Sequence, residues 1–142
     1  MTWTLQDATW ADDEDRLLAV RLEVFVDEQA VPLDEEVDHH DPTSVHLLVV
    51  DGGEPVATGR LTPDGHIGRM AVRKPWRGRG LGGAILDELV VRAQAAGMDR
   101  VVLAAQTHAI PFYAAHGFAA YGDVFDDCGI PHRWMERSLR SR

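Results

Sequence analysis

The chain has 142 residues, of which 45% are hydrophobic and 26% charged, and its formal net charge is −9 at pH 7. This length predicts one domain over residues 1–142, because a second core would leave each part near the lower limit for independent folding. The composition excludes a disordered chain, and no apolar run approaches the ~18 residues of a membrane span. The first residues lack the basic and apolar regions of a signal peptide, so we expect a cytoplasmic protein. The one cysteine, Cys128, excludes an internal disulfide.

The charges are distributed unevenly along the chain. The first 51 residues hold 14 acidic residues and two arginines, whereas residues 52–142 hold nine acidic and 12 basic residues. Five of these bases follow one another with no acidic residue between them: Arg69, Arg73, Lys74, Arg77 and Arg79. With a pI of about 5.1, nucleic-acid binding is not expected, because phosphate neutralisation needs a larger basic surface. A small anionic ligand suits this basic run better.

The first part of the chain predicts a short strand followed by an amphipathic helix. Trp3 and Leu5 alternate with polar residues, as in a strand, and Thr9-x-x-Asp12 is typical of a helix start. The helix should end near Gln29, with one apolar face formed by Leu18, Leu22 and Phe25. Residues 32–42, which are rich in proline and acidic residues, are expected to form a solvated loop.

The rest of the chain predicts six strands and two helices. Strands over 45–50, 55–61 and 66–72 are joined by tight glycine turns, which favours an antiparallel meander. A long helix follows, with Gly97 as its stop and an apolar stripe formed by Leu81, Ile85, Leu89 and Ala93. A buried strand over 100–105, a short helix over 109–116 and strands over 118–125 and 132–139 complete the chain, the last two around a turn at 126–131. This order favours an α/β fold of three layers on a mixed sheet.

The segment between the meander and the long helix is rich in glycine and arginine. It reads Val72-Arg73-Lys74-Pro75-Trp76-Arg77-Gly78-Arg79-Gly80-Leu81-Gly82-Gly83. Glycines let the backbone approach a ligand closely, and free amides at a helix start attract an anion. A phosphate or diphosphate is therefore the expected ligand, and a purely structural turn is the alternative.

Two nucleotide-binding motifs fit this segment less well. Gly78-x-Gly80-x-x-Gly83 formally matches the dinucleotide fingerprint, but that motif follows the first strand of a βαβ unit and needs an acidic residue at the end of the next strand. Here three strands precede it, and the next strand ends without an acidic residue. A P-loop requires Gly-Lys-Ser/Thr, whereas Gly83 is followed by Ala84. A dinucleotide-binding motif and a P-loop are therefore both disfavoured.

A third pattern fits better. Arg77-x-x-Gly80-x-Gly82 is similar to the R/Q-x-x-G-x-G/A diphosphate loop of the GNAT superfamily, the acetyl-CoA-dependent N-acetyltransferases. The preceding strand, residues 70–75, and the downstream Phe112-Tyr113-x-x-x-Gly117-Phe118 also resemble elements of that superfamily. The resemblance covers about residues 45–125. Residues 21–29, 36–38 and 129–132 further resemble the small bacterial ElaA-type acetyltransferases.

The resemblance implies a GNAT-like α/β/α fold with a mixed, mostly antiparallel sheet, and acetyl-CoA as the acetyl donor. It implies that the pantetheine pairs with the third meander strand, that the glycine loop holds the diphosphate, and that Tyr113 gives a proton to the departing thiolate. The donor-binding residues expected from it are Met70, Ala71, Val72, Arg77, Gly78, Arg79, Gly80, Leu81, Gly82 and Gln106.

The acceptor is expected to be an amine, which needs a base because an amine of lysine-like pKa is neutral in only about one molecule in a few thousand at pH 7. The resembled fold borders the acceptor with the segment after the first helix and the last turn. His132 and Glu28 are therefore candidate catalytic residues, and Glu36 and Asp38 are further candidates for the base. The acidic first 51 residues would favour a cationic acceptor, or they form only a soluble face.

The leading hypothesis is an enzyme that transfers acetyl to a primary amine by direct attack in a ternary complex. The alternative is a non-catalytic acyl-CoA-binding sensor or regulatory module. A small metabolite, an aminoglycoside, a polyamine and a peptide N-terminus all stay open as acceptors, and a homodimer stays open as the assembly; no nucleic acid or membrane partner is expected. No metal is expected either, because His39-His40-Asp41 and Cys128-x-x-x-His132 each lack the three or four spaced ligands of a zinc site.

Overall fold

A computed structural model describes residues 3–31, 38 and 40–139 of the chain. The strands form two antiparallel sheets, with the orders β1-β2-β3-β4 and β5-β7-β6. The strands of the first sheet are β1 (Trp3–Ala8), β2 (Val45–Asp51), β3 (Glu54–Leu61) and β4 (Ile67–Val72). Those of the second are β5 (Arg100–Gln106), β6 (Ala119–Asp127) and β7 (Ile130–Ser138). The predicted order of helices and strands along the chain is confirmed.

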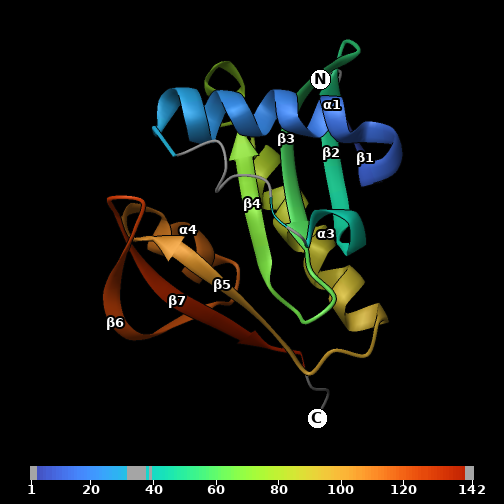
Figure 1. The fold of residues 1–142 in the computed structure, drawn as a ribbon. Coiled ribbons are helices and arrows are strands. Elements are labelled where there is room, and N and C mark those ends of the chain that lie inside the picture. Colours follow the sequence, from blue (N-terminus) through green and yellow to red (C-terminus); the bar gives the residue numbers. More distant parts are fainter. Residues whose placement is uncertain (1–2, 32–37, 39, 140–142) are drawn as a thin grey trace.

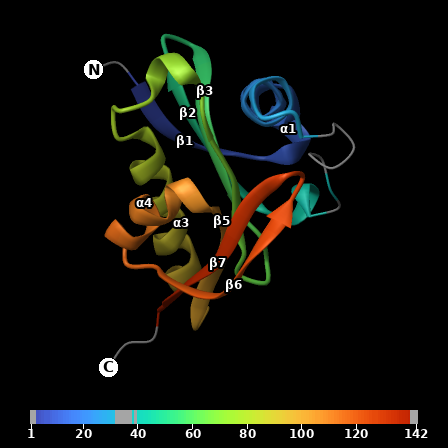
Figure 2. The same cartoon turned by 90° about the vertical axis from the view of Figure 1, so that its left-hand side faces the viewer.

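Helices cover both faces of the sheets, as Figure 2 shows. One face carries α1 (Trp10–Arg21), and the other carries α3 (Leu81–Ala95) and α4 (Ile110–Ala115). A π-helix, η1 (Leu22–Glu28), continues α1 to the end that the sequence predicts. The short 3-10 segments are η2 (Asp41–Thr43), η3 (Lys74–Trp76) and η4 (Thr107–Ala109). The three-layer α/β/α arrangement predicted from the sequence is confirmed.

The apolar stripe predicted for the long helix forms the centre of the core. Leu81, Ile85, Leu89 and Ala93 of α3 are all buried, and they pack against β2, β3 and β5. The contact with β3 is close, because a Cβ atom added at Gly59 would lie 2.6 Å from Cγ2 of Ile85. Gly59 therefore lets α3 rest directly on the strand backbone.

The predicted buried face of the first helix is wrong by about one position. Thr9 caps α1 as predicted, with its hydroxyl accepting a hydrogen bond from the amide of Asp12. The buried positions, however, are Leu17, Val20, Arg21 and Val24, whereas Leu18, Leu22 and Phe25 are only half-buried. The face is rotated because Arg21 lies inside the protein, where Asp41 neutralises it: Nη1 of Arg21 lies 2.8 Å from Oδ1 of Asp41.

The two sheets meet at one end and diverge at the other, as Figure 1 shows for β4 and β5. At the joined end a parallel bridge pairs His66 with Val102, and the amide of Val102 donates to the carbonyl of Gly65 at 3.0 Å. β4 is paired with β3 on its other edge. Its edge toward β5 consequently opens into the space between the sheets.

The last hairpin has a shorter turn than the predicted 126–131. β6 and β7 extend to Asp127 and Ile130, which pair with each other. Cys128 and Gly129 alone form the turn, and both have positive φ, 53° and 78°. Two central residues of positive φ are the geometry that matches the twist of paired strands, so the strands continue to the turn.

Candidate active site

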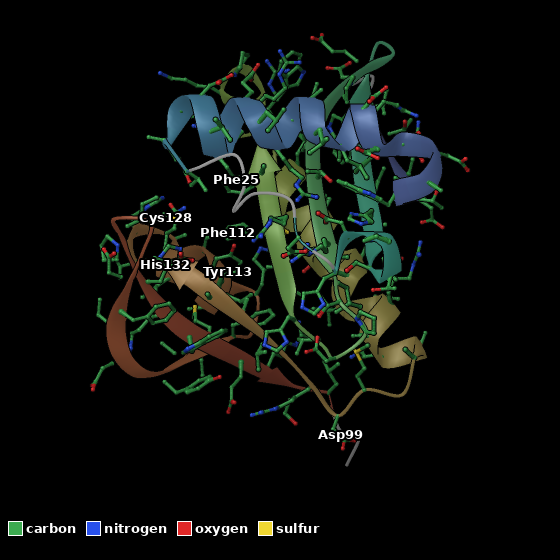
Figure 3. The ribbon with its side chains drawn as sticks, viewed as in Figure 1. Phe25, Asp99, Phe112, Tyr113, Cys128 and His132 are labelled. Carbon is green, nitrogen blue, oxygen red and sulfur yellow. The ribbon has the colours of Figure 1, made fainter. Side chains whose placement is uncertain are left out.

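A cleft with a volume of about 940 Å³ lies where the two sheets diverge. Its walls come from η1, β4, the glycine loop and the start of α3 on one side, and from β5, α4 and the β6–β7 hairpin on the other. Figure 3 shows Phe25, Phe112, Tyr113, Cys128 and His132 gathered at this opening, and all five line the cleft. Residues from segments far apart in the sequence therefore meet around one space.

The glycine loop presents open backbone at the start of α3. Gly78 and Gly80 have φ values of 78° and 83°, and a Cβ atom at either would meet no other atom within 4 Å. Gly80 is the N-cap of α3 and no side chain caps the helix. Amides in the first turn of a helix have no partner within the helix, and the helix dipole makes this end attractive to anions. The loop is thus a backbone cradle for an anionic group.

The arginines around the loop differ in what they bind. The guanidinium of Arg77 lies 2.8 and 2.7 Å from the two carboxylate oxygens of Glu28, and its Nε donates to the carbonyl of Val72 at 2.8 Å. Arg73 pairs with Glu23 and Glu54. Arg79 is exposed and makes no ion pair with any residue that the structure describes. Arg79 is therefore a cation of the loop that can bind a ligand without exchanging a partner, and it lies beside the cleft, outside its lining.

Tyr113 extends from α4 into the buried end of the cleft. Its ring packs edge-on against Phe112 and Phe118, with ring centroids 5.0 and 6.2 Å away. Burial raises the pKa of Tyr113 to about 12, because a low-dielectric environment disfavours the phenolate. The phenol is therefore protonated throughout the neutral range and available as a hydrogen-bond donor.

His132 lies on β7, directly opposite Gln106 of β5. Its ring stacks on Phe125 at 5.8 Å with an interplanar angle of 24°, and its Nδ1 lies 2.8 Å from the backbone carbonyl oxygen of Ile130. A carbonyl can only accept, so Nδ1 carries the hydrogen and Nε2 of the neutral ring is an acceptor. The residue is 8% exposed and lines the cleft, so a proton acceptor is present at the cleft wall.

The acidic candidates for a base are held by arginines. Hydrogen bonding to Arg77 lowers the pKa of Glu28. Burial alone would raise the pKa of Asp38, but the guanidinium groups of Arg60 and Arg69 outweigh it and hold that pKa well below its usual range. A carboxylate with a lowered pKa is a weaker base, so these two positions suit the role less well than His132. Glu36 and His39 lie outside the described residues.

Two sets of side-chain hydrogen bonds in this region were not predicted from the sequence. Gln29, which follows η1, and Gln106, which ends β5, bind each other: Nε2 of Gln106 lies 2.8 Å from Oε1 of Gln29. Arg60 of β3 lines the cleft floor and donates to both Asp38 and Asp41. The alternation of Thr58 and Arg60 in an apolar strand was the available signal for an inward-facing arginine.

Five acidic residues of the first part of the chain are paired with arginines from the rest. The pairs are Asp7–Arg92, Glu23–Arg73, Glu28–Arg77, Asp38–Arg60, Asp38–Arg69 and Asp41–Arg60. Part of the charge asymmetry seen in the sequence is thus used for contacts within the fold. Because these carboxylates already face guanidinium groups, they contribute less to attraction of a cationic acceptor than the sequence count suggests.

Within residues 3–31, 38 and 40–139, no group of three or more metal-ligand side chains is close enough to hold a metal ion. No helix in the part of the chain that the structure describes is both long and apolar enough to cross a membrane.

Known proteins resemble this chain over most of its length. Residues 11–139 match the family model of the acetyltransferase (GNAT) domain. YjcF of Bacillus subtilis, an uncharacterised N-acetyltransferase, is 43% identical over 120 residues, which cover 82% of this chain and 86% of that protein.

Solved structures agree with this match. Escherichia coli ElaA has a TM-score of 0.86 at 29% identity, and an acyl-CoA N-acyltransferase from Pseudomonas aeruginosa has a TM-score of 0.86 at 32% identity. Each match covers 96% of this chain and 100% of the other. The resemblance drawn from the glycine loop and the Phe112-Tyr113 element is confirmed, and the chain belongs to the GNAT family of acetyltransferases and is an acyltransferase.

Proposed function

We propose that this enzyme transfers an acetyl group from acetyl-CoA to the primary amine of an acceptor, by direct attack in a ternary complex. The observation that carries the proposal is that the open amides of the glycine loop and the buried phenol of Tyr113 line one continuous cleft. The loop amides suit a diphosphate, and the phenol suits a leaving thiolate. A single elongated donor could therefore contact both.

The donor site follows from the backbone around the loop. The amides from Gly78 to Gly82, with the guanidinium groups of Arg77 and Arg79, would hold the diphosphate. The edge of β4, formed by Met70, Ala71 and Val72, would pair with the amides of the pantetheine, and Gln106 stands on the opposite wall. Holding both reactants in one cleft makes the reaction effectively unimolecular, an effect that can approach ~7 kcal/mol or more.

The donor supplies a thioester, whose carbonyl carbon is the electrophile and whose thiolate is the leaving group. The amine nitrogen forms the new bond to this carbon, and the carbon–sulfur bond breaks. His132 would take the proton that the amine loses, through Nε2 or a bridging water. Because attack requires the neutral amine, this proton transfer determines how much of the acceptor can react.

Tyr113 would stabilise the departing thiolate. A thiol has a reference pKa of about 8.5, well below the pKa of about 12 that burial gives Tyr113. Complete proton transfer to the thiolate is therefore unfavourable, and the phenol acts mainly by donating a hydrogen bond to the sulfur as negative charge develops. This modifies the proton-donor role that the resemblance implies.

Thermal unfolding and turnover test the proposal. Acetyl-CoA should raise the Tm, since a ligand at 100 times its Kd stabilises a protein by about 2.7 kcal/mol, and Arg77→Ala should remove most of this shift. Incubation with acetyl-CoA and a panel of primary amines should release free CoA thiol at a rate that depends on the amine. An unchanged Tm at saturating acetyl-CoA would contradict donor binding, and binding without thiol release would contradict the reaction.

A further inference from the structure

Two consecutive residues at the end of η1 bind opposite sides of the cleft. Glu28 pairs with Arg77 of the glycine loop, which follows β4. Gln29 binds Gln106 at the end of β5. The end of η1 therefore spans the space between β4 and β5. The contact of Gln29 with Gln106 holds the adjacent Glu28 beside the glycine loop.

Arg77 is fully occupied in this arrangement. Its two terminal nitrogens contact the Glu28 carboxylate, and its Nε is bonded to the carbonyl of Val72. A guanidinium binds a carboxylate and a phosphate with the same planar, two-pronged geometry. Glu28 therefore already holds the face of Arg77 that a diphosphate in the cradle would use.

The pair is also placed where exchange is easy. The side chains of Arg77 and Glu28 are 39% and 38% exposed, so water can solvate either partner as it is released. Exposed ion pairs of this kind contribute little net stability. A diphosphate that is also held by the loop amides and by Arg79 can displace a single carboxylate from such a pair.

We infer that Glu28 sets the affinity for the donor by competing with its diphosphate for the Arg77 guanidinium. This inference rests on the proposed function, since it assumes that the diphosphate lies at the glycine loop. It gives Glu28 a role in donor affinity in place of a role in proton transfer. It also distinguishes Glu28 from Glu23, whose partner Arg73 is shared with Glu54 and does not line the cleft.

The test is the donor dependence of Glu28→Gln. If Glu28 competes, this variant should bind acetyl-CoA about two- to five-fold more tightly, the range expected from releasing one exposed ion pair. The KM for acetyl-CoA should fall by a similar factor. The KM for S-acetyl-pantetheine, which has no diphosphate, should not change. In an Arg77→Ala background, Glu28→Gln should no longer affect acetyl-CoA binding.

Glu88→Gln is the control, because it removes one carboxylate from a half-buried ion pair away from the cleft, with Arg92 on α3, which also pairs with Asp7. Removal of any carboxylate makes the protein less negative, which by itself could attract the anionic donor, and Glu88→Gln measures that effect alone. Glu88→Gln should leave the affinity for acetyl-CoA unchanged. Weaker acetyl-CoA binding by Glu28→Gln would overturn the inference, because it would mean that Glu28 positions Arg77 instead of competing for it. An equal gain with Glu88→Gln, or with S-acetyl-pantetheine, would also overturn it. If the wild-type protein binds no acetyl-CoA, it is the proposed function that fails.

Discussion

The carbonyl oxygen of Ile130 lies 2.8 Å from Nδ1 of His132, two residues further along β7. This contact fixes which ring nitrogen carries the hydrogen, and it leaves Nε2 as an acceptor at the wall of the cleft. The stacked ring of Phe125 holds the imidazole in place from one side. The local structure of the last hairpin thus places a proton-accepting nitrogen, Nε2 of His132, where the amine substrate is expected to enter.

Replacement of His132 by glutamine should lower kcat/KM for the amine by about 10²- to 10⁴-fold, the usual contribution of a general base. Glutamine keeps a polar side chain but cannot take up the proton. The Kd for acetyl-CoA, measured by thermal shift, should stay the same. A variant that keeps the wild-type kcat/KM for the amine would remove His132 from the mechanism.

Tyr113→Phe should slow turnover by about 10²-fold or more, the typical cost of removing one donor that stabilises developing negative charge. Because phenylalanine preserves the contacts with Phe112 and Phe118, both Tm and acetyl-CoA affinity should change little. Burial raises the pKa of Tyr113 to about 12, so the wild-type rate should show no decline from ionisation of this residue up to pH 10. Single-turnover thiol release over this pH range measures both effects.

Gly80→Ala should weaken donor binding as well as stability. At a φ of 83°, a side chain carries a cost of about 1–2 kcal/mol, and relief of this strain would reorient the amides of the cradle. Gly52→Ala is the control, since Gly52 also has positive φ and open surroundings but lies in the β2–β3 turn. Both variants should lower the Tm, whereas only Gly80→Ala should lose the Tm increase caused by acetyl-CoA. Equal responses to acetyl-CoA would show that the loop conformation is not needed for binding.

The stability of the fold should depend on the protonation of His46. This residue is buried, its Nε2 lies 2.8 Å from the carbonyl oxygen of Asp41, and its ring stacks on Trp10. Burial lowers the pKa of His46, against a smaller raising effect from Asp41. The unfolded chain therefore binds this proton more readily than the folded chain does.

It follows that the contribution of His46 is present above the unfolded-state pKa of about 6.5 and is lost as the pH falls below it. The free energy of unfolding from urea titrations should decrease between pH 7 and pH 5, by up to about 1.4 kcal/mol per pH unit for one proton. His46→Gln, which keeps a donor for the Asp41 carbonyl, should flatten this slope even though it lowers stability at pH 7. A slope that persists unchanged in the variant would assign it to another group.

The parts of the structure that could be predicted from sequence are those determined by local patterns. The stripe of α3 was correct because each of its positions is apolar and the periodicity is complete. The glycine loop was found because its motif and its place between a strand and a helix are both local. The start of α1 at Thr9 was correct for the same reason, since its cap involves only neighbouring residues.

The errors and omissions arise from contacts between distant segments. The buried face of α1 was displaced because an arginine at position 21 is buried only when Asp41, 20 residues away, is present to neutralise it. The partners of Arg77 and Gln106 lie 49 and 77 residues away, in η1 and just after it. No periodicity or motif encodes such pairs. Candidate donor-binding and base residues could be named from the sequence, but not which of them already have a partner.

The pairing of early carboxylates with later arginines limits how this protein can be recombined with its relatives. A hybrid that takes its first 44 residues from another member of the family would place new side chains against Arg60, Arg69, Arg73, Arg77 and Arg92. Arg73 and Arg92 would keep Glu54 and Glu88 as partners. Loss of the carboxylates at positions 28, 38 and 41, however, would remove the ion-pair partners shown for Arg77 and Arg60, and Arg60 is buried. Successful hybrids should therefore keep both sides of each pair from the same parent, so that the segments behave as one inherited unit.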